Sequence, residues 1–204
     1  PLPDATVRIL EQAPVIREVA DRLTHWQPAH VVLDPVMIAK SGDALLEKAA
    51  IGALLDALLP CATVLTPNLP EAGVLLGERA PENPKEMRRA AERLRERMTH
   101  AGARWVVLKG GHLSHGDAID LVTDGDRMIE LALPRVDTKN THGTGCTLSA
   151  AIAALLPQSP DAPTAIRRAK DYLAGALAAA DRLDVGRGHG PVHHFHAMWR
   201  TAQK

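Results

Sequence analysis

The chain has 204 residues, of which 46% are hydrophobic, and this length can bury one sizeable core. Lys and Arg together number 24, as do Asp and Glu, so no net positive field is available to hold a nucleic acid or an anionic membrane surface. We therefore expect a single globular domain over residues 1–204, without a nucleic-acid or membrane partner.

The apolar runs, such as 31–33 and 105–108, are far shorter than the roughly 20 residues that span a bilayer. Residues 1–8 lack the basic start and apolar stretch of a secretory signal, and the chain has only two cysteines, Cys61 and Cys146. These features favour the cytoplasm, where both thiols stay reduced.

Helical and extended apolar patterns alternate along the chain. Residues 5–26 carry apolar side chains mostly at helical spacing and predict one helix or two short ones, although Pro14 weakens the middle. The β-branched run at 29–33 predicts a buried strand that stops at Asp34 and Pro35. The same reasoning predicts helices at 44–59, 69–76 and 84–100 and strands at 62–65 and 105–108.

An antiparallel hairpin then interrupts the alternation. The strands predicted at 118–123 and 128–133 flank an Asp-Gly-Asp sequence that is typical of a tight turn. Further helices are predicted from about Cys146 to Leu156 and over 163–183. Strands that alternate with helices indicate an α/β fold with a mostly parallel sheet and crossover helices.

Four polar clusters follow a predicted strand or open a predicted helix. They are Asp34, residues 66–71, residues 109–112 and residues 140–146. Ligands of open α/β sheets bind outside the carboxyl ends of the strands, so we expect the clusters to converge there. A phosphate cradle is predicted where the turn 143–146, Lys109 and Glu71 meet.

The turn Gly143-Thr144-Gly145-Cys146 precedes a predicted helix. Glycines let the backbone approach a ligand closely, and the N–H groups of a helix N-terminus attract a phosphate or its transition-state charge. Thiols at helix N-termini lose their proton readily, so Cys146 is a candidate base for a substrate hydroxyl. The alternative is a plain loop, with Cys146 as a small core residue.

Three other positions offer oxygen ligands and a cation. Asn68 and Glu71, three residues apart at a predicted helix start, fit a capping box, the organisation of magnesium, or both, since the two roles are compatible. Lys109 ends a buried strand, so its ammonium group lies either over phosphates or in solvent. Asp34 is either a second acidic group near magnesium or an ordinary turn residue.

The C-terminal segment 186–196 contains four histidines within eight residues. A second pair of ligands at metal spacing is missing elsewhere in the sequence, and the glycines between the histidines indicate a loop. We therefore do not expect zinc here.

Five clusters occur in a fixed order: Asp34-Pro35-Val36-Met37-Ile38-Ala39-Lys40-Ser41-Gly42, Thr66-Pro67-Asn68-Leu69-Pro70-Glu71-Ala72, Lys109-Gly110-Gly111-His112, Asn140-Thr141-His142-Gly143-Thr144-Gly145-Cys146-Thr147 and Gly188-His189-Gly190-Pro191-Val192. In this order they resemble the bifunctional hydroxymethylpyrimidine/phosphomethylpyrimidine kinases of thiamin synthesis, from about residue 15 to the C-terminus. The resemblance implies a ribokinase-like three-layer sandwich, with a mostly parallel sheet flanked by helices. It also implies ATP- and Mg²⁺-dependent phosphorylation of the pyrimidine alcohol and then of its monophosphate, which gives the diphosphate.

The resemblance implies a role for each cluster. Cys146 is similar to the catalytic base of the family, and the backbone of Gly143, Thr144 and Gly145 is similar to its anion hole. The other implied roles are nucleotide-phosphate binding by Lys109, Asn68 and Thr141, magnesium binding by Asp34 and Glu71, and a pyrimidine contact by Val36. Such a site works by positioning and charge neutralisation.

The family's chain begins with a strand and a glycine-containing segment that supply much of the pyrimidine pocket, and nothing before Pro1 matches them. We therefore expect an N-terminally incomplete chain that lacks this strand region and exposes a sheet edge. Two alternatives stay open, a pyridoxal or pyridoxine kinase of the same fold and a non-catalytic ligand-binding domain. Cys146 favours the pyrimidine enzymes, because many sugar kinases and several pyridoxal kinases carry an aspartate there, although other pyridoxal kinases carry a cysteine. A homodimer is left open.

Overall fold

The computed structural model describes residues 5–7, 12–37, 48–111, 118–186 and 188–199. The chain divides into two compact units, Pro1–Ala132 and Leu133–Lys204. The described part contains no helix with the length and apolar character needed to cross a bilayer. The single domain expected over residues 1–204 stays a prediction.

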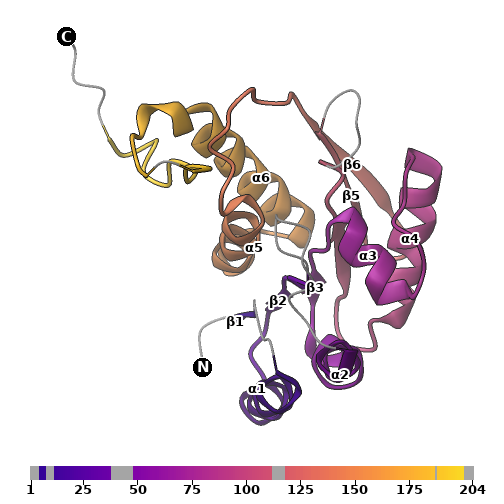
Figure 1. Ribbon diagram of the computed structural model, residues 1–204. Coiled ribbons are helices and arrows are strands. Elements are labelled where there is room, and N and C mark those ends of the chain that lie inside the picture. Colours follow the sequence, from indigo (N-terminus) through magenta and orange to yellow (C-terminus); the bar gives the residue numbers. More distant parts are fainter. Residues whose placement is uncertain (1–4, 8–11, 38–47, 112–117, 187, 200–204) are drawn as a thin grey trace. The chain divides into compact units, whose positions relative to one another are not determined.

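A sheet in the order β1-β2-β3-β4-β5-β6 organises the first unit (Figure 1). The first four strands pair in parallel, and β5 runs antiparallel to β4. Their bounds are β1 (Ala5–Val7), β2 (Val31–Leu33), β3 (Val64–Leu65), β4 (Trp105–Leu108), β5 (Ala118–Thr123) and β6 (Met128–Leu133). The mostly parallel sheet and its antiparallel addition confirm the expected fold class.

The helix predicted from residue 5 is wrong at its start. Ala5–Val7 forms β1 and pairs in register with Val31–Leu33 of β2. Over so short a run, helical spacing and strand alternation cannot be told apart, and the ladder to β2 decides. The helix α1 begins only at Ala13, with Pro14 in its first turn, where proline is tolerated because the N–H of that position lacks a helical partner.

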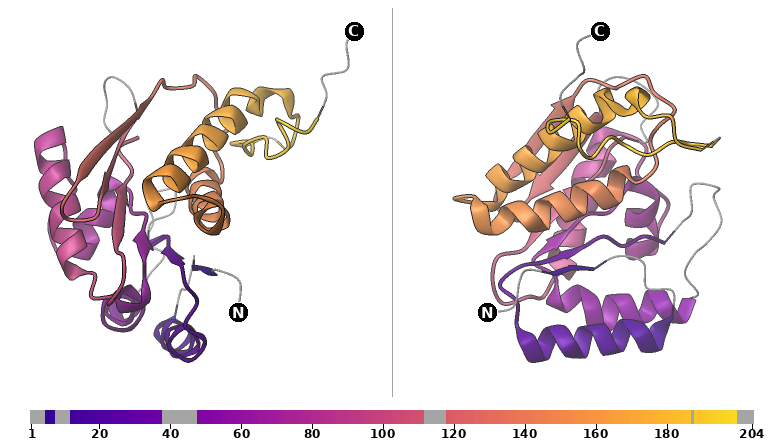
Figure 2. Two further views of the ribbon diagram at one scale, coloured as in Figure 1. Left: turned by 180° about the vertical axis from the view of Figure 1, so that it is seen from behind. Right: turned by 90° about the vertical axis from the view of Figure 1, so that its left-hand side faces the viewer.

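The helices α1 to α4 lie on one face of this sheet (Figures 1 and 2). Their bounds are α1 (Ala13–Trp26), α2 (Lys48–Ala53), α3 (Leu69–Leu76) and α4 (Pro84–Arg97). The helix α2 continues into a π-helical turn, η1 (Leu54–Leu58), and a 3₁₀ turn, η2 (Leu59–Cys61). Residues 44–47 of the predicted second helix lie outside the described residues. Buried side chains of the first unit, among them Ile16, Leu65 and Met87, form one hydrophobic core beneath the helices.

The described part of the second unit contains two α-helices, α5 (Thr144–Leu155) and α6 (Ala162–Ala178), which pack side by side (Figure 2). Each ends in a 3₁₀ turn, η3 (Leu156–Gln158) and η4 (Ala180–Arg182) respectively. The carboxylate of Asp161 caps α6 by accepting from the N–H of Thr164. Beyond η4 the chain returns to the turn before α5, where His142 and Pro191 form a parallel bridge.

Candidate active site

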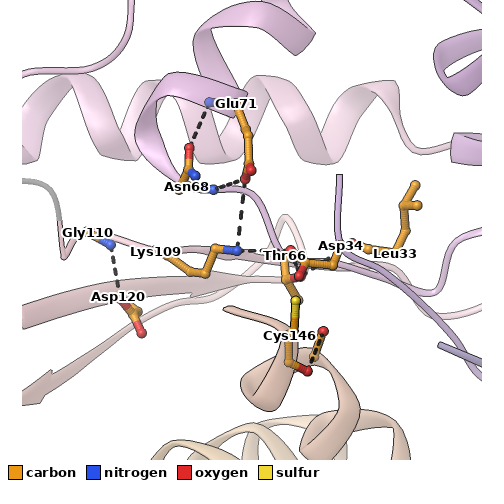
Figure 3. Close-up of polar contacts among 10 residues, drawn as sticks. Leu33, Asp34, Thr66, Asn68, Glu71, Lys109, Gly110, Asp120 and Cys146 are labelled. Carbon is orange, nitrogen blue, oxygen red and sulfur yellow. Dashed lines mark hydrogen bonds and ion pairs between the residues drawn. The ribbon is translucent and has the colours of Figure 1, made fainter. Parts of the chain in front are cut away.

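Five polar residues meet at the carboxyl ends of β2, β3 and β4 (Figure 3). Asp34, Thr66 and Lys109 directly follow these three strands. Asn68 and Glu71 stand at the start of α3, after β3. The three strands are parallel neighbours, so their carboxyl ends share one edge of the sheet. We call these five residues the strand-end cluster.

The strand-end cluster is built around a buried ion pair. Lys109 Nζ donates to Asp34 Oδ1 at 3.0 Å, and the hydroxyl of Thr66 donates to the same oxygen at 3.1 Å. The Asp34 side chain is 1% exposed and that of Lys109 is 16% exposed. The ammonium group of Lys109 is therefore shielded from solvent. Extension into solvent, one of the two placements left open by the sequence, is not observed.

Glu71 connects the cap of α3 to the cation. The carbonyl oxygen of the Asn68 side chain accepts from the Glu71 N–H at 2.8 Å, and Glu71 Oε2 accepts from the Asn68 N–H at 2.7 Å. This is a complete capping box. The same Oε2 lies 3.9 Å from Lys109 Nζ. The predicted capping role is therefore confirmed, while the organisation of magnesium by the same side chain stays a prediction.

Burial sets the protonation of Glu71. Loss of hydration raises the pKa of its carboxyl from 4.5 to about 7, although the charge of Lys109 and the Asn68 N–H lower it. The nearby carboxylate of Asp34 adds to the increase. Near neutral pH the protonated and the ionised form of Glu71 are therefore both populated. A divalent cation would favour the ionised form.

The backbone of Lys109 is held from both sides. Its N–H donates to the Pro67 carbonyl at 2.9 Å, within a parallel bridge between Asn68 and Lys109. On the other side, the N–H of Gly110 donates to Asp120 Oδ1 at 3.0 Å. The sequence prediction did not include Asp120. The sequence signal that could have identified it is a single acidic residue inside an otherwise apolar predicted strand, because a buried carboxylate needs a hydrogen-bond donor.

The second predicted cluster lies at the N-terminus of α5, in the second unit. Gly143 is the N-cap with φ 83° and ψ 7°, a left-handed conformation that favours glycine, and its carbonyl accepts from the Thr147 N–H at 2.8 Å. The N–H groups at the start of such a helix have no intrahelical acceptor. Cys146 is a free, half-buried thiol in this first turn.

The remaining predicted residues are placed as follows. Val36 is half-buried two residues beyond Asp34, and its N–H donates to the Asp34 carbonyl at 2.9 Å. Thr141 is half-buried in the segment before Gly143. Residues 38–42 and His112 of the quoted motifs lie outside the described residues. The structure thus brings Asp34, Asn68, Glu71 and Lys109 together, and their convergence with the turn 143–146 stays a prediction.

Comparison with known proteins decides the family. Residues 7–193 match the family described as phosphomethylpyrimidine kinase. The chain belongs to this family. It is 46% identical over 194 residues to the hydroxymethylpyrimidine/phosphomethylpyrimidine kinase of Rhizobium meliloti, covering 95% of this chain and 71% of the relative. It is 44% identical over 187 residues to the thiamine biosynthesis bifunctional protein of Geobacter sulfurreducens, covering 92% of this chain and 37% of that longer protein.

Solved structures of phosphomethylpyrimidine kinases and pyridoxal kinases share this fold. The pyridoxal kinase from Staphylococcus aureus in complex with ADP superposes with a TM-score of 0.85 at 30% identity, over 96% of this chain and 69% of that one. The fold alone therefore does not choose between the two kinases. Sequence identity favours the pyrimidine enzyme, at 46% to the Rhizobium meliloti kinase against 30% to this pyridoxal kinase.

Magnesium fits the chemistry of the strand-end cluster. Among the described residues no three His, Cys, Asp or Glu side chains converge on a point that could hold a metal by themselves. Mg²⁺ commonly uses one or two carboxylates and completes its shell with water and substrate phosphates. Asp34 and Glu71, both beside Lys109, suit such a shared ion.

The C-terminal histidines make packing contacts and hydrogen bonds in the second unit. The ring of His193 is buried against Trp199, and that of His196 lies beside Tyr172. His189 Nδ1 lies 3.1 Å from the carbonyl of Lys139. Their neighbour Gly190 has a more specific role, because it contacts the segment before α5.

Proposed function

We propose that this member of the phosphomethylpyrimidine kinase family transfers the γ-phosphoryl group of ATP to 4-amino-5-hydroxymethyl-2-methylpyrimidine, and then to its monophosphate, in thiamin synthesis. The observation that carries the proposal is the strand-end cluster, in which the shielded Lys109 lies between Asp34, at the end of β2, and Glu71, at the start of α3. A fixed cation between acidic groups suits a magnesium nucleotide, because phosphoryl transfer depends on positioning and charge neutralisation.

Each residue of the cluster has a proposed task. Lys109 places a positive charge at the nucleotide phosphates, and Asn68 orients them through the start of α3. Asp34 and Glu71 hold Mg²⁺, which neutralises the charge that develops on the transferred phosphoryl group. Their burial strengthens these interactions, since fixed charges act more strongly away from water.

Cys146 is the proposed base. The substrate oxygen forms a bond to the γ-phosphorus while the bond to the β-γ bridging oxygen breaks and ADP leaves. The hydroxyl proton passes to the thiolate of Cys146. The N–H groups of Gly143, Thr144 and Gly145, together with the nearby Thr141, stabilise the charge on the transferred group, and Val36 contacts the pyrimidine ring.

A pyridoxal kinase is the second candidate. The observation in its favour is the similarity to the Staphylococcus aureus pyridoxal kinase, whose structure contains ADP. The chemistry is the same, with a hydroxymethyl group on a nitrogen heterocycle as acceptor. The proposed setting for either enzyme is the cytoplasm, and a homodimer remains a prediction that sedimentation equilibrium can test.

The experiment compares wild type with Cys146→Ala, using the full-length protein, ATP and Mg²⁺. The acceptors are the pyrimidine alcohol, its monophosphate and pyridoxal. Loss of the base should lower kcat by about 10² to 10⁴-fold and leave ATP affinity nearly unchanged. Cys61→Ala is the matched control, because Cys61 is the other half-buried free thiol and lies outside both clusters.

Near-wild-type turnover by Cys146→Ala would show that Cys146 only packs. Phosphorylation of pyridoxal alone by the wild type would establish the second candidate. Lack of transfer to any acceptor, by a protein that still binds ATP, would leave the non-catalytic ligand-binding alternative.

A further inference from the structure

The segment Gly190–Val192 is hydrogen-bonded to the turn that precedes α5. The N–H of His142 donates to the Gly190 carbonyl at 3.0 Å, and the N–H of Val192 donates to the His142 carbonyl at 3.4 Å. His142 and Pro191 thus form a parallel bridge between segments that are far apart in the sequence. The backbone directly before Gly143 is therefore fixed by residues beyond α6.

Asn140 lies at the centre of this arrangement. Its side-chain carbonyl accepts from the N–H of Gly190 at 3.1 Å. Its amide nitrogen donates to Asp181 Oδ1 at 2.8 Å and to the Ala180 carbonyl at 3.4 Å. Asn140 is only 7% exposed, so both ends of a buried amide are satisfied by partners beyond α6. The Thr138 hydroxyl donates to the same Asp181 oxygen at 2.5 Å.

Only glycine fits at position 190. A Cβ atom built on Gly190 would lie 2.2 Å from Asn140 Oδ1 and 2.8 Å from Asn140 Cγ. The next nearest atom, Asn140 Cβ, is 3.4 Å away, which is an ordinary contact. The side chain of Asn140 and the absence of a side chain at Gly190 therefore depend on each other.

We infer that Asn140 is a positioning residue, which holds the turn before α5 so that its N–H groups meet the transferred phosphoryl group. The inference rests on the proposed function. Three residues separate Asn140 from Thr144, the first residue of α5, so a shift of this side chain moves the helix start. A misplacement of about 1 Å in a catalytic group lowers the rate by up to about 10²-fold.

The first test is a double-mutant cycle of Asn140→Ala and Gly190→Ala in the full-length protein. Each single variant should lower kcat by about 10 to 10²-fold, with KM for ATP changed by less than about threefold. Removing the Asn140 side chain removes the two closest contacts of the new methyl group. Gly190→Ala should therefore be almost neutral in the Asn140→Ala background. Independent effects that multiply in the double variant would overturn the inference.

The second test restores the hydrogen bond with its polarity reversed. Asn140→Asp places a carboxylate against Asp181 and removes the donor. Adding Asp181→Asn supplies a donor from the other side, while the carboxylate introduced at position 140 still accepts from the N–H of Gly190. The pair should recover part of the kcat that Asn140→Asp loses, because the contact with position 181 is remade while the Ala180 carbonyl still lacks its donor. A pair as slow as Asn140→Asp alone would overturn the inference.

A measurement without substrate separates this inference from the proposed function. Amide hydrogen exchange at His142 and Thr147, whose N–H groups donate to the carbonyls of Gly190 and Gly143, should become faster in Asn140→Ala, while exchange in the middle of α6 stays unchanged. Unchanged exchange at the start of α5 would overturn the positioning role even in an active kinase. Faster exchange in a protein that transfers no phosphoryl group would support the positioning role and refute the function.

Discussion

The side chains of Lys109 and Asp34 form a 3.0 Å ion pair although their strands, β4 and β2, are not neighbours in the sheet. β3 lies between them, so the strands are separated by about 10 Å and the lysine must reach across the end of β3. Thr66, at the end of β3, donates to the same carboxylate. The pair thereby connects three strand ends, and its loss should affect folding as well as activity.

Lys109→Met should destabilise the protein by about 3 kcal/mol, because it leaves the carboxylate of Asp34 buried without its cation. Urea unfolding followed by circular dichroism gives the difference. Arg22→Ala is the control, because Arg22 and Glu18 form an ion pair whose side chains are 66% and 59% exposed. Breaking that pair should cost less than about 1 kcal/mol. Equal costs for both variants would contradict the prediction.

Glu71→Gln should become more stable relative to wild type as the pH rises from about 4.5 to about 7. The pKa of Glu71 is raised to about 7 by burial, so in this window the unfolded chain has lost a proton that the folded chain keeps. Wild-type stability therefore falls through the window, by about 3 kcal/mol in total, and the uncharged glutamine escapes this loss. Unfolding of both proteins at pH 5 and pH 8 measures the effect.

Glu86→Gln is the matched control for the pH experiment. Glu86 occupies the same position in α4 that Glu71 occupies in α3, three residues after an asparagine cap. Its pKa is lowered, first by the N–H of Glu82 and then by Arg79. A lowered pKa changes stability only below about pH 4.5, so between pH 5 and pH 8 the stability of Glu86→Gln relative to wild type should stay constant. The same trend in both variants would show that the burial of Glu71 is not the cause.

Asn68→Ala should lower both stability and kinase activity. The loss of the cap costs about 1 kcal/mol of folding free energy. Asn83→Ala removes the same kind of cap from α4, where the Asn83 side chain accepts from the Glu86 N–H at 3.0 Å. We expect similar losses of stability, measured as thermal midpoints, and a loss of activity for Asn68→Ala alone. Full activity in both variants would show that Asn68 only caps α3.

Gly143→Ala should lower kcat by more than its effect on stability explains. A left-handed conformation costs a side-chain-bearing residue about 1 to 2 kcal/mol. Gly77, the C-cap of α3, has a similar φ of 72°, and a Cβ atom would meet nothing within 4 Å at either glycine. Gly77→Ala should therefore match the stability loss and keep its activity. Parallel activity losses in the two variants would contradict a role for Gly143 in phosphoryl transfer.

Local sequence patterns predicted the middle of the chain well. α3 and β4 begin and end where the apolar pattern indicated, because their caps and flanking prolines or glycines are distinct. β1 was mistaken for helix because three residues carry no recognisable period and its identity comes from pairing with β2. Whether a segment this short forms a strand depends on the strand it pairs with rather than on its own residues.

The candidate site was likewise predictable from the sequence only in part. Residues beside strand ends, such as Asp34 and Lys109, were predictable because the fold class fixes where the strand ends gather. The contacts of Asp120 and Asn140 were not predicted, since their partners are set by tertiary structure. Asn140 meets Gly190 across 50 positions of sequence, and no local pattern marks such a pair.

The contact between Asn140 and Gly190 also bears on the order in which parts of the second unit fold. It closes a loop of 50 residues that contains both α5 and α6, whose own hydrogen bonds are local. Helices form within microseconds, whereas a long loop closes only after its entropy cost is offset by packing. The helices of the second unit should therefore fold first, and the turn before α5 should acquire its binding geometry as one of the last steps.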